Sequence, residues 1–359
     1  MKKSFLTVFM VLAISLAAVF TFAGCGDKKD SHAADNSFVG CLSATTYADA
    51  DGAARGFLSE ELDGGATKTQ FVDAEEGNAL SAEEIESLEL GDDIDAADID
   101  SAVYYTVKYV ETGARAAAYD SSAQTKSYEI IIIKVGSVYY YYIPVMPKGS
   151  AITNSYLAMV CDPQKYFNVT ETVVSTSTSK AQGYSATATI TMVTKIADGN
   201  AHLKITASML GNEEVTEYYL VTTSKGIVSY YYDDYSHSWE KAGSAEYSSL
   251  ETYLEEELFD FDHSYFERTD SGFKMASDKM QRYLNDVMGE QFKSVLRLGL
   301  SIDSVSANYY VKDARLDEIE VDLAMSGVVE GVSLTASASA HTTYTNYGTT
   351  VIDLPFDVD

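Results

Sequence analysis

Residues 185–192 read SATATITM, and every second side chain in this stretch is apolar. Successive side chains of a β-strand point to opposite faces, so the alternation predicts a strand with one apolar and one hydroxyl-bearing face. The same pattern recurs at residues 204–209, and again at residues 334–341, where apolar residues alternate with Thr, Ser and finally His341. Repeated one-sided strands predict an antiparallel sheet that is covered on one face only.

Two stretches nearby have the apolar spacing of amphipathic helices. Residues 245–258 place Tyr247, Leu250, Leu254 and Leu258 on one stripe, and residues 278–298 place a larger stripe rich in Met and aromatic residues after Ser277 as N-cap. We expect these helices to cover the apolar sheet face. Small sheet residues facing large helix residues either interdigitate or leave an apolar hollow, and the pattern leaves both open.

The first half of the chain predicts helices followed by strands. Apolar residues recur at helical spacing from Tyr47 to Leu62, and Gly64-Gly65 ends the pattern. Ser81 and Glu84 have the spacing of a capping box at the start of a short helix. Extended runs follow, the last two joined as a hairpin around Gly136-Ser137: 102–111, 127–135 and 138–145. This order predicts an α+β domain.

Prolines mark a boundary between domains. The chain has four prolines, and Pro144, Pro147 and Pro163 flank one stretch of irregular composition. The expected organisation begins with a signal peptide at 1–24 and a flexible tether at 25–40. An N-terminal α+β domain at 41–147, a connector at 148–163 and a C-terminal domain at 164–359 follow.

The N-terminus has the layout of an export signal. Lys2 and Lys3 precede an apolar run that ends at Ala23-Gly24, and an uncleaved anchor helix is the alternative reading of this run. The residues Phe22-Ala23-Gly24-Cys25 resemble the lipobox of bacterial lipoproteins, with Phe22 where Leu is usual. The resemblance implies export and lipidation of Cys25, whose acyl chains would include palmitate and would hold the protein at the outer face of the bacterial cell membrane.

Charge limits the partners of the chain. It carries 54 acidic and 25 basic residues, a formal net charge of −29. This balance disfavours nucleic acid and gives no electrostatic attraction to anionic lipid, so the covalent lipid at Cys25 is the expected membrane contact. Besides Cys25, only Cys41 and Cys161 remain. They are candidates for one disulfide bridge, and two free thiols are the alternative.

Two segments of the C-terminal half support a resemblance to a known superfamily. The stretches GIVSYYYDDYSHSWEKA at 226–242 and TTYTNYGTTVIDLPFDVD at 342–359, together with the helix pair, resemble the LolA/LppX-like lipoprotein superfamily. The resemblance implies a strongly curved antiparallel sheet around helices, with an apolar cavity that holds acyl chains. The predicted fold class is thus α+β: a small helix-then-antiparallel-sheet domain followed by a curved antiparallel β-sheet (half-barrel) wrapped over helices.

Catalytic motifs are absent from the sequence. There is no G-x-S-x-G and no G-x-G-x-x-G, and the three S-x-x-K matches lack a K-T-G partner. The histidines show no metal-binding spacing, so none is expected to bind a metal: His32, His202, His237, His263 and His341. Carboxylates at 49–60 and 92–100 lack the spacing of a calcium loop, which leaves only a nonspecific cation site open.

These observations predict a non-catalytic, lipid-anchored envelope lipoprotein without a cofactor. A lipid or another apolar small molecule between sheet and helices is its expected ligand, and no residue is assigned to that site. The alternative is an acidic surface module for protein interaction or structure, in which sheet and helices pack solid. The two differ in whether the sheet face holds a ligand.

Overall fold

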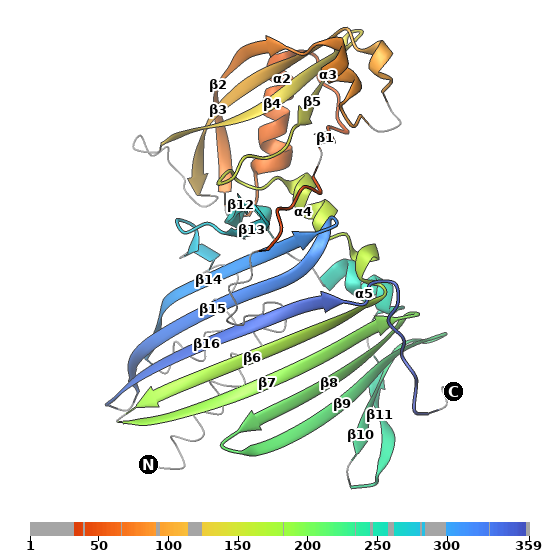
Figure 1. Ribbon diagram of the computed structural model, residues 1–359, viewed down its shortest axis with the longest axis vertical. Helices are drawn as coiled ribbons and strands as arrows, with labels where there is room; N and C mark the ends of the chain where they lie inside the picture. Colours follow the sequence, from red (N-terminus) through yellow and green to blue (C-terminus); the bar gives the residue numbers. More distant parts are fainter. Residues whose placement is uncertain are drawn as a thin grey trace. The chain divides into compact units, whose positions relative to one another are not determined.

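The computed structural model describes residues 32–356, with gaps at 39, 66, 91–93, 114–123, 182, 234, 245–246, 258–261, 281, 284–298 and 330. The chain divides into two units (Figure 1). We call Ala33–Val160 with Phe261–Lys279 the small-sheet unit. Cys161–Asp260 with Met280–Asp359, together with His32, form the large-sheet unit.

The small-sheet unit is built on a five-stranded antiparallel sheet. Its strands, in spatial order, are β1 (Cys41–Leu42), β5 (Val138–Ile143), β4 (Thr125–Val135), β3 (Ser101–Gly113) and β2 (Thr67–Ala79). The runs predicted at 102–111, 127–135 and 138–145 are confirmed as β3, β4 and β5, and the predicted hairpin at Gly136-Ser137 joins the last two. Further elements of this unit are η3 (Ala96–Asp98), α4 (Asn154–Val160), η5 (His263–Tyr265) and the antiparallel hairpin of β12 (Phe266–Thr269) and β13 (Gly272–Met275).

Strand β4 lies in the middle of the small sheet, and both of its faces are covered. Ile130 to Ile133 are all buried, as a short continuous apolar run predicts for such a strand. Helix α2 (Ala50–Phe57), continued as the π-helical turn η2 (Leu58–Leu62), covers one face: the Phe57 ring centroid lies 5.0 Å from that of Tyr128. The other face packs with Leu80 and Leu90 beside α3 (Ala82–Glu86), whose predicted capping box is present.

The large-sheet unit contains a long antiparallel sheet. From β6, the strands β7 to β11 follow one another outward as a meander, and β14 to β16 approach the other side of β6. In spatial order the strands are β11 (Ser238–Ser244), β10 (Gly226–Asp233), β9 (Asn212–Thr223), β8 (Asn200–Met209), β7 (Tyr184–Ala197), β6 (Val169–Ala181), β16 (Val332–Thr345), β15 (Arg315–Val329) and β14 (Leu300–Lys312). Short helices η4 (Pro163–Tyr166) and α5 (Leu250–Glu257) complete this unit within the described ranges.

Two-residue turns fix the register of the meander. Asp198-Gly199 and Leu210-Gly211 join β7 to β8 and β8 to β9, and all four residues have positive φ. Such turns match the twist of paired strands, and glycine supplies the left-handed backbone at the second position. The alternation predicted for β7, β8 and β16 is confirmed by this register: Ala188, for example, lies on the buried face and Thr187 on the exposed one.

The predicted fold class is wrong. The described chain is mostly antiparallel β-structure in two large sheets with few short helices, and not a balanced α+β protein with helices under the second sheet. Of the two helices expected there, α5 forms with Leu250 and Leu254 buried, whereas residues 284–298 of the other lie outside the described residues. Among the described residues, no helix has both the length and the apolar character needed to cross a membrane.

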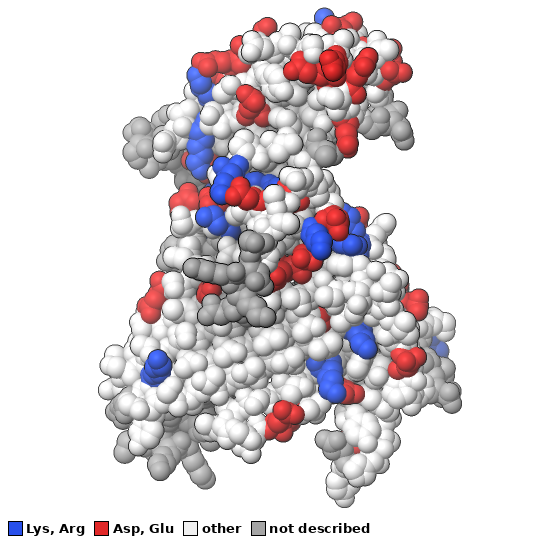
Figure 2. All heavy atoms as spheres, in the orientation of Figure 1, with Lys and Arg blue, Asp and Glu red and all other residues white. Residues whose placement is uncertain are grey.

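Edge position explains why one strand was missed. Strand β2 reads TKTQFVDAEEGNA and lies at one edge of the small sheet, paired only with β3. An edge strand buries little and is protected from unwanted pairing by charged side chains, so it need not alternate. No strand was predicted for this stretch, because its acidic residues interrupt any apolar alternation. Figure 2 shows further acidic side chains gathered over α3.

Two segments that were expected to be irregular are packed into the small-sheet unit. The predicted tether, 25–40, is fixed from Asp35 onward, because Asp35 and Phe38 are buried. Part of the predicted connector, 148–163, is helix α4, in which Tyr156 and Val160 have no exposed surface. The folded body thus begins earlier than the sequence suggested.

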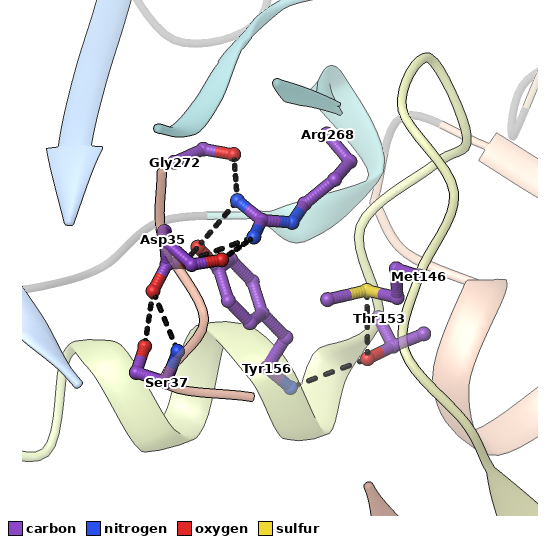
Figure 3. A network of polar contacts seen from close by, with 7 residues as sticks. All are labelled: Asp35, Ser37, Met146, Thr153, Tyr156, Arg268 and Gly272. Carbon is purple, nitrogen blue, oxygen red and sulfur yellow. Dashed lines mark hydrogen bonds and ion pairs between the residues drawn. The ribbon is translucent and has the colours of Figure 1, made fainter. Parts of the chain in front are cut away.

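A buried ion pair holds this N-terminal segment (Figure 3). The Arg268 guanidinium on β12 lies 3.1 Å from the Asp35 carboxylate and donates to the backbone oxygens of Asp35 and Gly272 at 2.7 and 2.6 Å. The Tyr156 hydroxyl donates to Asp35 at 2.7 Å, while Ser37 donates to its second oxygen through the backbone N–H at 3.0 Å. Because both charges are buried and hydrogen-bonded, removing one partner should cost far more than at the surface.

Arg268→Ala should lower the free energy of unfolding by about 3–5 kcal/mol, since Asp35 would keep a buried and unpaired charge. Lys148→Ala is the matched control, because Lys148 forms an exposed ion pair with Asp270 next to the same hairpin. That loss should stay below about 1 kcal/mol. Urea denaturation measures both, and equal losses would contradict the role assigned to Arg268.

Candidate functional site

The buried face of the large sheet carries a strip of very small side chains on three adjacent strands. The register places Ala338, Ser177 and Ala188 side by side, with Ala336, Ser179 and Ala186 in the next row and Ala340 with Ser175 in the row on the other side. All of them except Ala186 are buried. We call these eight residues the small-residue strip: Ala336, Ala338, Ala340, Ser175, Ser177, Ser179, Ala186 and Ala188.

Larger apolar side chains border the strip. On β15, Leu323 pairs with Ala338 and Met325 pairs with Ala336, and both are buried. On β7, Ile190 and Met192 continue the face beyond Ala188. Larger apolar side chains therefore border the strip on β15 and farther along β7. The opposite side of the same strands is hydroxyl-rich, with Thr178 and Thr187 in hydrogen-bond contact at 3.1 Å, and Figure 2 shows few charged side chains across β16, β6 and β7.

A row of polar side chains lies beyond the Ser175 end of the strip. Glu171 on β6 pairs with Tyr344 on β16 and with Thr194 on β7, and its carboxylate hydrogen-bonds with both side chains. Burial raises the pKa of Glu171 to about 7, although these two hydrogen bonds oppose the shift. Burial also raises the pKa of Tyr344 well above its usual value, helped by the nearby Glu171 charge. Near neutral pH the Glu171 carboxyl group at this end of the strip is therefore partly protonated and uncharged.

An unpaired hydroxyl lies one row nearer the strip. Thr342 on β16 is 1% exposed, and among the described residues its Oγ1 has no hydrogen-bond partner. Thr342 pairs with Val173 on β6, between the Glu171 row and the Ser175 row, and so shares the buried face. A buried hydroxyl without a partner costs about 1–3 kcal/mol, so such a group calls for an explanation. A ligand that accepts or donates a hydrogen bond at this place would satisfy it.

The dimensions of the strip suit an acyl chain. From Ser175 to Ser179, β6 rises about 14 Å at about 3.4 Å per residue. One acyl chain occupies about half of a hydrocarbon core that is about 30 Å thick. Apolar contacts with the strip favour a ligand that is leaving water.

The cysteines fall into two groups. Cys25 lies outside the described residues, so its lipidation stays a prediction. Cys41 and Cys161 are both free thiols, and the bridge considered for them is not formed in this structure. Burial raises the pKa of each thiol, so neither is an activated nucleophile.

The histidines and carboxylates considered from the sequence occupy different settings. His202 stacks on Tyr219, His237 lies in a turn with positive φ, and His263 is buried in η5. The carboxylates read as calcium-loop mimics have structural roles, since Asp49 caps α2 and Asp51 pairs with Arg55 at 2.7 Å. His32 and His341 lie near Glu318 in the large-sheet unit, and within the described chain only His32, Glu318 and Glu320 form a group that could hold a metal ion.

Sequence reasoning missed Glu171 and Thr342. The signal was present, because every second position of the stretch VTETVVSTSTSKA lies on one face of the strand: Glu171, Val173, Ser175, Ser177 and Ser179. Extending the alternation of β6 toward its N-terminus would have placed a carboxylate on the buried face. The hydroxyl-rich composition of this stretch hid the pattern, since serines stand where apolar residues were expected.

Comparison with known proteins adds little. No family model matches the chain, and no curated protein matches it. Among solved structures, the chain is similar to a DUF1329 family protein from Desulfovibrio piger ATCC 29098, at 10% sequence identity over 56% of this chain and 94% of that chain, with a TM-score of 0.19. A score this low does not establish a shared fold, and the resemblance to the LolA/LppX-like superfamily stays a prediction.

Glu171→Gln should remove a pH dependence of stability. The pKa of Glu171 is about 7 in the folded chain and 4.5 ordinarily, so the unfolded chain loses this proton first as pH rises. The wild-type free energy of unfolding should therefore fall relative to that of the variant between these two values, and the difference should level off above them. Urea denaturation at about pH 4 and about pH 8 measures it. A difference that does not change with pH, or a wild-type chain that gains stability relative to the variant as pH rises, would contradict the assignment.

Proposed function

We propose that this protein is a non-catalytic, lipid-anchored envelope protein whose large-sheet unit binds an acyl chain along the small-residue strip. The observation that carries the proposal is the unpaired Thr342 hydroxyl on the strip's own face, one row from Glu171. A solid core would place a partner or an apolar side chain there. A polar group at the end of an apolar strip is the arrangement that orients an amphipathic ligand.

The same polar row indicates which lipids would bind. A charged Glu171 repels an anionic head group, whereas both its neutral form and the Thr342 hydroxyl form hydrogen bonds with an uncharged one. The favoured ligand is therefore an acyl chain with a neutral hydroxyl or ester head, such as a monoacylglycerol. Binding would be passive, at about 0.8 kcal/mol per buried CH₂ group.

Anchoring is the second part of the proposal and rests on the sequence. Lys2, Lys3, the apolar run and the lipobox-like Phe22–Cys25 favour export and lipidation of Cys25. A net charge of −29 gives the body no attraction to anionic lipid, so the acyl chains on Cys25 would hold it at the outer face of the cell membrane.

Ala188→Phe should abolish ligand binding, because the ring would fill the middle row of the strip, where Ala188 lies between Ser177 and Met209. Equilibrium dialysis with tritiated monoolein and tritiated oleate measures it, and the wild-type chain should retain more monoolein than oleate. The overpacked variant should lose about 1–3 kcal/mol of stability and stay folded.

Thr189→Phe is the matched control, since it adds the same ring to the next residue of β7, on the opposite face. It should bind monoolein as the wild-type chain does. Unchanged binding by Ala188→Phe would place the ligand elsewhere. Failure of the wild-type chain to bind either lipid would favour the alternative, a solid protein-interaction module.

Thr342→Val should raise the stability of the protein and weaken its lipid binding. Replacing an unpaired buried hydroxyl by a methyl group should raise the free energy of unfolding by about 1 kcal/mol or more, while monoolein binding should weaken about fivefold through the lost hydrogen bond. Thermal denaturation and the same dialysis measure the two effects. A variant that loses stability and binds normally would show that the Thr342 hydroxyl has a structural partner and no ligand.

A further inference from the structure

The exposed face of the large sheet gathers imidazole and carboxylate groups from two strands and from the N-terminal segment. Glu318 and Glu320 lie on one face of β15, and His341 on β16 is the direct cross-strand partner of Glu320. The His341 Nε2 atom contacts Glu318 Oε1. His32 Nδ1 lies 3.8 Å from Glu318 Oε2, so this carboxylate lies between two imidazoles.

The His32 ring is held in place by stacking. Its centroid lies 3.5 Å from that of Tyr310 on β14, with an angle of 18° between the planes. The Tyr310 hydroxyl donates to Glu320 Oε2 at 2.7 Å and so orients the second carboxylate toward the same point. One ligand atom from each of His32, Glu318 and Glu320 lies within 4.8 Å of the others.

We propose that His32, Glu318, Glu320 and His341 bind one divalent transition-metal ion of the zinc class. Imidazole and carboxylate ligands in fourfold coordination are what zinc takes, at about 2.0–2.2 Å, and imidazoles argue against calcium or magnesium. The ligand atoms of His32, Glu318 and Glu320 lie within 4.8 Å of one another, and a small side-chain movement would bring His341, which contacts Glu318, into the fourth position. Tyr310 is a supporting residue that orients Glu320 and does not bind the metal.

Charge balance favours a metal over a plain ion-pair cluster. Both carboxylates are partly buried, and Glu318 is 19% exposed. In the described part of the chain, no lysine or arginine is ion-paired with Glu318 or Glu320. The imidazole nitrogens of His32 and His341 can provide lone pairs to a metal ion. A divalent cation supplies the missing positive charge and uses the lone pairs as well.

The site would tie the N-terminal segment to the large sheet. His32 follows Cys25 by seven residues, which span at most about 25 Å when fully extended. A metal bound through His32 would therefore keep the exposed face of β15 and β16 within that reach of Cys25. This inference does not depend on ligand binding at the small-residue strip, which lies on the opposite face of β16.

Zinc titration of the full-length chain in non-ionic detergent tests the proposal. After treatment with a chelator, the chain should take up one Zn²⁺ in competition with a chromogenic chelator, and its melting temperature should rise on binding. His341→Ala and Glu320→Gln should each weaken binding at least about tenfold and abolish that rise. Glu320→Gln keeps the size of the side chain, so it reports on coordination even if His341→Ala perturbs folding.

His202→Ala is the matched control, because His202 on β8 also faces a strand glutamate, Glu217 at 3.7 Å, without a second carboxylate–imidazole pair. It should bind zinc as the wild-type chain does. Equal affinity of the wild-type chain and both site variants, or sulfur ligands in the X-ray absorption spectrum of the zinc-bound chain, would overturn the proposal. Sulfur ligands in that spectrum would show that a cysteine thiol binds the metal.

Discussion

The pairing of β6 with β16 is the constraint on which the rest of the large-sheet unit depends. These strands are far apart in sequence, and twelve register pairs from Leu334–Ala181 to Thr345–Thr170 join them. The pairing sets Ala338 beside Ser177 and Tyr344 beside Glu171. Because side chains alternate with a period of two, a slip by one residue would exchange the buried and exposed faces.

That register creates two chemically different surfaces from one strand. On β16, Thr342 and the strip alanines occupy the buried face, and His341 occupies the exposed one next to Glu320. The buried face combines small apolar side chains with a polar row whose carboxyl has a raised pKa, which suits a neutral amphipathic ligand. The exposed face collects lone pairs and negative charge, which suits a cation. Both sites therefore follow from the same pairing.

The sequence was informative where one face of a strand is apolar. It predicted the faces of β7, β8 and β16, because alternation is a local property. It failed for β2, an acidic edge strand, and for the start of the folded body, because the burial of Asp35 depends on Arg268, which lies far along the chain. The same reason hid the polar row and the His–Glu cluster. Spacing motifs detect ligands on one segment, whereas His32, Glu318 and His341 come from three.

Native mass spectrometry of the chain from Gly26 onward, expressed in a bacterium and paired with organic extraction of the same sample, tests the central claim most directly. We expect an uncharged acyl lipid bound at close to one per chain, which is released when the protein unfolds. A folded chain with the bare polypeptide mass and no extractable lipid would contradict it, and the protein would then be an acidic module that binds other proteins.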